Sequence, residues 1–73
     1  MTRPEATATQ LARGREALGR GDFAAAVEQL EAARRAVPED PAVLHALAGA
    51  RLALGEHAAA EALLEEALGR NAE

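Results

Sequence analysis

Apolar residues recur at three- and four-residue intervals in four stretches of the chain, a period that predicts four helices. In the clearest stretch the apolar residues share one helical face: Phe23, Ala26, Val27, Leu30, Ala33 and Val37. Asp22 precedes this stretch as a favourable N-cap, and Pro38 stops it because proline has no backbone N–H to donate. We therefore expect one helix between Asp22 and Pro38.

The stretch before it carries a thinner apolar stripe, made of Leu11, Gly14, Ala17 and Leu18. Thr2 and Glu5 have the spacing of a capping box, so we expect this helix to begin as early as Arg3. It should run to about Gly19, because the glycines at positions 19 and 21 tolerate the positive φ that ends helices.

A third helix is expected to begin with Asp40 as its N-cap and Pro41 in its first turn, and to end at Gly55. The residues expected to be buried along it are Leu44, Leu47, Ala48 and Leu54. A fourth helix begins around His57, with Gly69 available just beyond its end. Its apolar residues are Ala60, Leu63, Leu64, Ala67 and Leu68.

The chain repeats itself at an offset of 34 residues, so that the stretch 21–33 recurs at 55–67. The matched pairs are Ala8 and Ala42, Ala12 and Ala46, Leu18 and Leu52, Gly21 and Gly55, the Ala triplets at 24–26 and 58–60, Leu30 and Leu64, Glu31 and Glu65, and Ala33 and Ala67. Chance alone rarely gives so much agreement at one period. Two copies of one helical unit are therefore indicated.

A 34-residue helix–turn–helix period with small residues at fixed places resembles the tetratricopeptide repeat family. The residues that carry the resemblance are Gly14, Gly21, Asp22, Phe23, Ala26, Leu30, Ala33 and Pro38 in the first copy, and Leu44, Leu47, Ala48, Gly55, Ala60, Leu64 and Ala67 in the second. The resemblance implies an all-α fold of two helix–turn–helix hairpins, with four antiparallel helices stacked as a short α-solenoid. We expect a single domain over residues 1–73, with repeat one at about 7–40 and repeat two at about 41–73.

The chain departs from the family pattern mainly in its first helix. Gln10 and Arg13 stand where the family prefers large apolar residues, and Ala17 and Arg51 stand where it prefers tyrosine. His57 replaces the aromatic residue of the turn. The first helix is thus the weakest part of the match.

The resemblance also implies a function, since the inner side of each repeat's first helix binds an extended or helical peptide in this family. Carried over residue by residue, these positions are Ala8, Leu11, Arg15 and Leu18 in repeat one and Ala42, His45, Gly49 and Leu52 in repeat two. The implied function is a protein–protein interaction module, a scaffold or adaptor that binds a peptide or partner protein. Leu11 and Leu18 have a second interpretation, as core contacts of a helix with few other large apolar residues.

Self-association is a further expectation. Residues 1–37 carry six Arg and five acidic residues, a sum of +1, whereas residues 38–73 carry two Arg and seven acidic residues, a sum of −5. We expect a homo-oligomer interface on the last helix at Leu63, Leu64 and Leu68, either head to tail against the arginines of the first helix or across a two-fold axis. One alternative is a purely structural homo-oligomerisation unit, and a distant one is a small regulatory subunit of an enzyme complex.

Composition excludes several other functions. The chain lacks Ser, Cys, Lys and Tyr, and neither His45 nor His57 has the spacing of a metal ligand pair, so we expect no enzyme, no metal and no cofactor. We interpret the spacing of His57 and Glu61 as a surface contact. The net charge of −4 argues against nucleic acid, and no apolar run is long enough to span a membrane. We expect a soluble, cytoplasmic protein.

Overall fold

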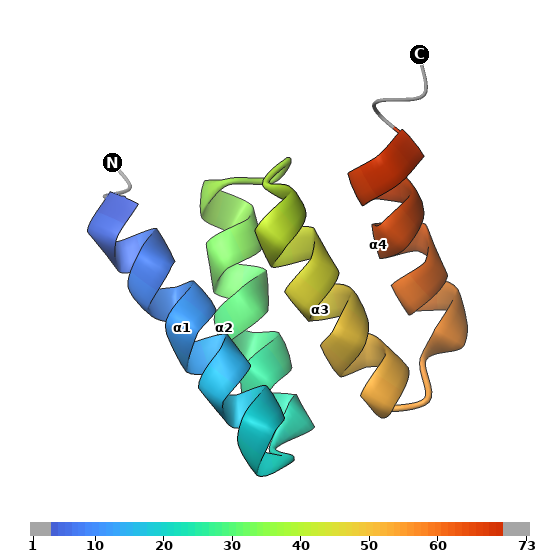
Figure 1. Cartoon of the computed structure of the whole chain (residues 1–73), viewed down its shortest axis with the longest axis horizontal. Coiled ribbons are helices and arrows are strands. Elements are labelled where there is room, and N and C mark those ends of the chain that lie inside the picture. Colours follow the sequence, from blue (N-terminus) through green and yellow to red (C-terminus); the bar gives the residue numbers. More distant parts are fainter. Residues whose placement is uncertain (1–3, 70–73) are drawn as a thin grey trace.

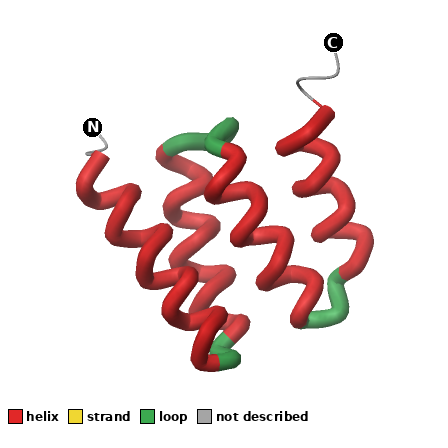
Figure 2. Tube along the Cα trace, viewed as in Figure 1, coloured by secondary structure: helices red, strands yellow, loops and turns green. Residues whose placement is uncertain are grey.

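The computed structural model describes residues 4–69, which form four α-helices joined by short turns, with no strand in that range (Figures 1 and 2). The helices are α1 (Pro4–Arg20), α2 (Phe23–Ala36), α3 (Pro41–Ala53) and α4 (His57–Gly69). α1 packs against α2 and α3 against α4, while α3 also lies against α2 and touches α1. The predicted all-α fold of two stacked helical hairpins is confirmed.

The aspartates predicted as N-caps occupy those positions. The Ala25 N–H donates to Oδ1 of Asp22 at 3.2 Å, and the Ala42 N–H donates to Oδ1 of Asp40 at 2.9 Å. Each bond satisfies one of the backbone donors that the first turn of a helix leaves without a partner. Pro41 is the first residue of α3, where its missing N–H has no consequence.

The two hairpin turns are the same structure repeated. Gly21 has φ +80° and Gly55 has φ +82°, a region that residues with a side chain rarely adopt. The Gly21 N–H donates to the Leu18 carbonyl at 3.0 Å, and the Gly55 N–H donates to the Leu52 carbonyl at 2.9 Å. The glycines at this position therefore close both hairpins by the same hydrogen bond.

The core lies between the helices and is made largely of leucine and alanine. Its buried apolar residues are Ala17, Ala26, Leu30, Ala33, Val43, Leu44, Leu47, Ala48, Ala50, Ala60, Leu63 and Ala67. The many alanines allow the helix axes to approach closely. Gly14 shows how closely, because a Cβ atom added there would lie 2.6 Å from the Leu30 side chain.

The burial of α3 differs in two ways from the sequence prediction. Leu44, Leu47 and Ala48 are buried as expected, and Val43 and Ala50 are buried as well, because α3 has neighbours on several sides. The prediction for Leu54 is wrong, since its side chain is 43% exposed. Leu54 follows the last residue of α3 as its C-cap and has left the helical face that α4 covers.

The ends of the helices agree closely with the pattern. α2 ends at Ala36, with Val37 as its C-cap, directly before Pro38. Gly69 is the last residue of α4 rather than the residue beyond it. The proposed capping residue Thr2 and the start at Arg3 lie outside the described residues.

Candidate functional site

The positions expected to contact a partner lie on α1 and α3. Their spacing of four and then three residues places each set on one side of its helix, and the sets are equivalent at the 34-residue offset. We call this surface the α1/α3 face: Leu11, Arg15 and Leu18 on α1, and His45, Gly49 and Leu52 on α3. α1 touches α3 directly, so the two sets lie on neighbouring helices (Figure 1).

The polar members of the α1/α3 face are open to solvent. Arg15, His45 and Gly49 are exposed, and Leu52 is 52% exposed. Ala8 is also exposed, whereas Ala42 is half-buried. A single exposed leucine is common on protein surfaces. Leu52 is of interest because it shares its side of α3 with the exposed residues His45 and Gly49.

Leu11 and Leu18 fit both interpretations that the sequence left open, as core contacts and as part of the surface. Each packs against the buried core and is only half-buried. Between them on α1, Gly14 and Ala17 take the fully buried positions. The two leucines therefore contribute to the stability of α1 and still offer apolar surface on the α1/α3 face.

Gly49 is the member of this face that the fold itself does not explain. It lies inside α3, where glycine costs roughly 0.5–1 kcal/mol relative to alanine. A Cβ atom added to Gly49 would meet nothing within 4 Å, unlike one added to Gly14. No neighbour among residues 4–69 requires the glycine, and the lack of a side chain leaves the backbone of α3 open to close approach from outside.

The three leucines expected to form an oligomer interface are not equivalent. Leu63 is only 5% exposed and belongs to the core of its own chain, so it offers little surface to a second chain. Leu64 is half-buried and packs against that core. Leu68 is 69% exposed. Any apolar contact made by α4 therefore depends on Leu68 and the exposed part of Leu64.

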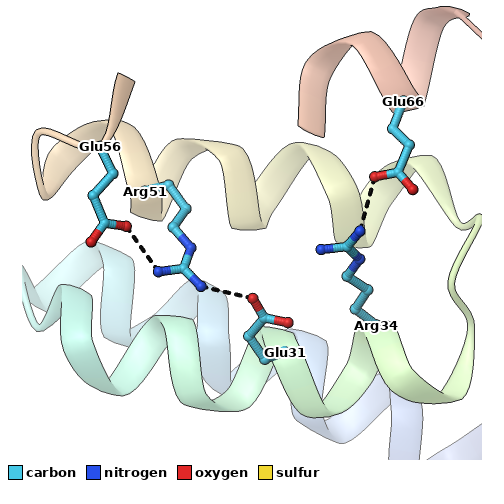
Figure 3. A network of polar contacts seen from close by, with 5 residues as sticks. All are labelled: Glu31, Arg34, Arg51, Glu56 and Glu66. Atoms are coloured by element: carbon cyan, nitrogen blue, oxygen red, sulfur yellow. Dashed lines mark hydrogen bonds and ion pairs between the residues drawn. The ribbon is translucent and has the colours of Figure 1, made fainter. Parts of the chain in front are cut away.

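An ion-pair network that the sequence did not reveal lies on α2, α3 and α4 (Figure 3). Arg51 donates to Oε2 of Glu31 and to Oε1 of Glu56, both at 2.8 Å, and Arg34 donates to Oε1 of Glu66 at 3.0 Å. Arg51 thus joins α3 to α2 and to the turn before α4. Arg34 joins α2 to α4.

The network borders an open cleft of about 230 Å³. The cleft is lined by Glu31, Arg34, Arg51, Ala59, Ala62, Leu63 and Glu66. Hydrogen bonds from Arg51 to Glu56 and to Glu31 raise the pKa of Arg51 above its ordinary value, so this guanidinium stays charged. Each of the two arginines is bonded to a carboxylate within the chain, so the ion pairs at the cleft hold α2, α3 and α4 together.

The sequence pattern gave little indication of these ion pairs, because their partners are far apart in the chain. Arg51 and Glu31 are 20 residues apart, and Arg34 and Glu66 are 32 apart. No helical spacing links such pairs. The one available sign was Arg51 itself, a charged residue at a place where the family prefers tyrosine.

The described part of the chain contains no metal-binding cluster. Among residues 4–69, no group of three or more His, Asp or Glu side chains could hold an ion. His45 and His57 are both exposed and belong to different helices. None of the helices described here has the length and apolar character needed to cross a membrane.

Comparison with known protein families gives a match. A family model described as Tetratricopeptide repeat matches residues 11–73. No curated protein and no solved structure gives a significant match. The match covers α1 from Leu11 onward and all of α2, α3 and α4.

Proposed function

Because the chain belongs to the tetratricopeptide repeat family, we propose that it is a protein–protein interaction module that binds an extended segment of a partner on its α1/α3 face. Repeats of this family generally mediate protein–protein interaction. The observation that carries the proposal is the accessibility of four residues of this face on two neighbouring helices: Arg15, His45, Gly49 and Leu52.

The chemistry of the face indicates the kind of segment it fits. Leu11, Leu18 and Leu52 supply apolar surface, and Arg15 supplies the positive charge of the face. A guanidinium binds a carboxylate with paired hydrogen bonds, which favours a partner with an acidic residue among apolar ones. The exposed backbone at Gly49 allows the partner's main chain to come close to α3.

Replacing Arg15 by glutamate is expected to weaken binding of such a partner by at least about tenfold, because a charged hydrogen bond becomes a like-charge contact. A suitable partner is a peptide selected from a displayed library for binding to the full chain. Fluorescence anisotropy measures its dissociation constant, and His45→Glu in the same chain should weaken it further. Circular dichroism should show unchanged helicity, since both side chains are exposed.

Arg35→Glu is the matched control for Arg15→Glu. Arg35 is also an exposed arginine, but it lies on α2, so the substitution makes the same change in net charge away from the α1/α3 face. Binding should survive it. Equal loss in both variants would mean that overall charge governs binding, and the proposal for the α1/α3 face would then be abandoned.

Self-association through α4 is a second candidate, favoured by the exposure of Leu68. Sedimentation equilibrium of the chain alone is the test. A dimer that Leu68→Glu dissociates would support this candidate. A folded monomer at high micromolar concentration in moderate salt would reject it.

A further inference from the structure

The 34-residue period allows the two second helices, α2 and α4, to be compared position by position. Four positions of α2 are buried or half-buried: Val27, Leu30, Glu31 and Arg34. Their equivalents on α4 are Glu61, Leu64, Glu65 and Leu68, of which all but the half-buried Leu64 are exposed. We call these four residues the open α4 face.

The difference in burial follows from the number of neighbours. α2 is packed between α1 and α3, whereas the backbone of α4 lies against α3 and stands at the edge of the stack (Figure 1). At one repeat position, Leu30 is 0% exposed and Leu64 is only half-buried. The open α4 face is therefore the side of α4 on which a further helix would take the place that α3 takes on α2.

The contact of α3 with α2 shows what such a helix needs. Arg51 of α3 donates to Glu31 of α2 at 2.8 Å (Figure 3). Glu31 directly follows the buried Leu30 in the sequence. On the open α4 face, Glu65 is equivalent to Glu31 and Leu64 is equivalent to Leu30. Glu65 is exposed and, within residues 4–69, its carboxylate makes no hydrogen bond or ion pair. The carboxylate that receives an arginine on α2 is thus available on α4.

The docking side of α3 has a specific pattern. Leu44, Leu47 and Arg51 follow one another at intervals of three and four residues, and both leucines are fully buried. We propose that the open α4 face binds an amphipathic helix of a partner protein with this pattern, two large apolar residues followed by an arginine that pairs with Glu65. Glu61 adds a second negative charge to the face and further favours a basic helix.

In a second copy of the chain, the helices with this pattern are already packed. α3 has its own Leu44 and Leu47 buried, and α2, which carries the pattern as Val27, Leu30 and Arg34, has Leu30 buried and Arg34 bonded to Glu66. The residues of α1 equivalent to Leu44, Leu47 and Arg51 are Gln10, Arg13 and Ala17. These carry no large apolar side chain, and the third position has lost its charge. Two α4 helices facing each other would bring Glu61 and Glu65 of one copy towards those of the other, a like-charge contact. The pattern therefore favours a different protein as the occupant.

The probe for this inference is a labelled peptide of residues 40–55, which contains the α3 pattern, titrated with the full chain and followed by fluorescence anisotropy. Glu65→Arg in the protein should weaken binding by at least about tenfold, since it replaces an ion pair by a like-charge contact. A peptide with Arg51→Glu should bind the wild-type protein weakly and the Glu65→Arg protein strongly. Such a reciprocal recovery requires the two residues to meet.

Glu28→Arg is the matched control in the protein, because Glu28 is exposed on α2 and the change in charge is the same. It should leave the affinity unchanged. Leu68→Glu, at a position that is 69% exposed, should weaken binding of the peptide while Glu65 keeps its charge. Circular dichroism should show that every variant remains helical.

Three results would overturn the inference. The first is an absence of binding to the wild-type chain. The second is a loss of affinity in Glu65→Arg that the Arg51→Glu peptide does not recover. The same holds if Glu65→Arg loses no affinity at all, which is the result expected if the peptide displaces α3 within the chain. The third is a dimer of the chain alone that Glu65→Arg dissociates, which would make a second copy the occupant.

Discussion

Leu30→Ala is expected to lower the free energy of unfolding by about 2–5 kcal/mol, the range for removing a buried leucine side chain. Leu30 is 0% exposed and lies in the core between α1 and α3. Small domains have total stabilities near the low end of about 5–15 kcal/mol. The variant should therefore lose much of its helicity at room temperature, which urea titration followed by circular dichroism measures.

Leu64→Ala is the control that makes this result specific. Leu64 occupies the same repeat position as Leu30 but is half-buried, because no helix within residues 4–69 covers that side of α4. Its replacement should cost clearly less, and Leu68→Ala should stay within about 0.5 kcal/mol of the wild type. Equal losses at positions 30 and 64 would contradict the account of α4 as the uncovered end of the stack.

Gly14→Ala is expected to destabilise the protein by about 1–3 kcal/mol, although alanine favours helices. The new Cβ atom would lie 2.6 Å from Cγ and Cδ2 of Leu30, nearer than packed carbon atoms come. This crowding should outweigh the gain of roughly 0.5–1 kcal/mol that alanine brings to a helix interior. The midpoint of urea unfolding measures the balance.

Gly49→Ala is the same chemical change, but it is expected to have the opposite effect on stability. A Cβ atom there meets nothing within 4 Å, so the substitution should raise the free energy of unfolding by about 0.5–1 kcal/mol. If both alanine variants were more stable than the wild type, the close approach of α1 to α2 at Gly14 would be wrong. A loss at Gly49 would mean that its environment is more crowded than the structure shows.

Local signals in the sequence predicted the helices well. The caps at Asp22 and Asp40, the turn glycines at positions 21 and 55 and the stop before Pro38 act through nearby backbone atoms, so a short window contains all the information they need. Leu54 was misassigned because periodicity continues past the point where a helix ends. Its side chain is 43% exposed since the chain has already turned.

The candidate sites were harder to predict because they depend on which helix covers which. Leu63 and Leu68 both looked like surface leucines of the last helix, yet they are five residues apart and point to different sides of α4. Only the packing of α3 shows that Leu63 is in the core. The pairing of Arg51 with Glu31 likewise requires the arrangement of two helices, which no short window contains.

The most direct test of the proposed function is backbone amide chemical-shift mapping of the full chain as the selected peptide is added. The largest changes are expected along the α1/α3 face, at Leu11, Arg15, Leu18, His45, Gly49 and Leu52. Amides on the outer side of α2, such as Glu28, should stay unchanged. Saturable binding with no change along α1 and α3 would contradict the claim that this face binds the partner.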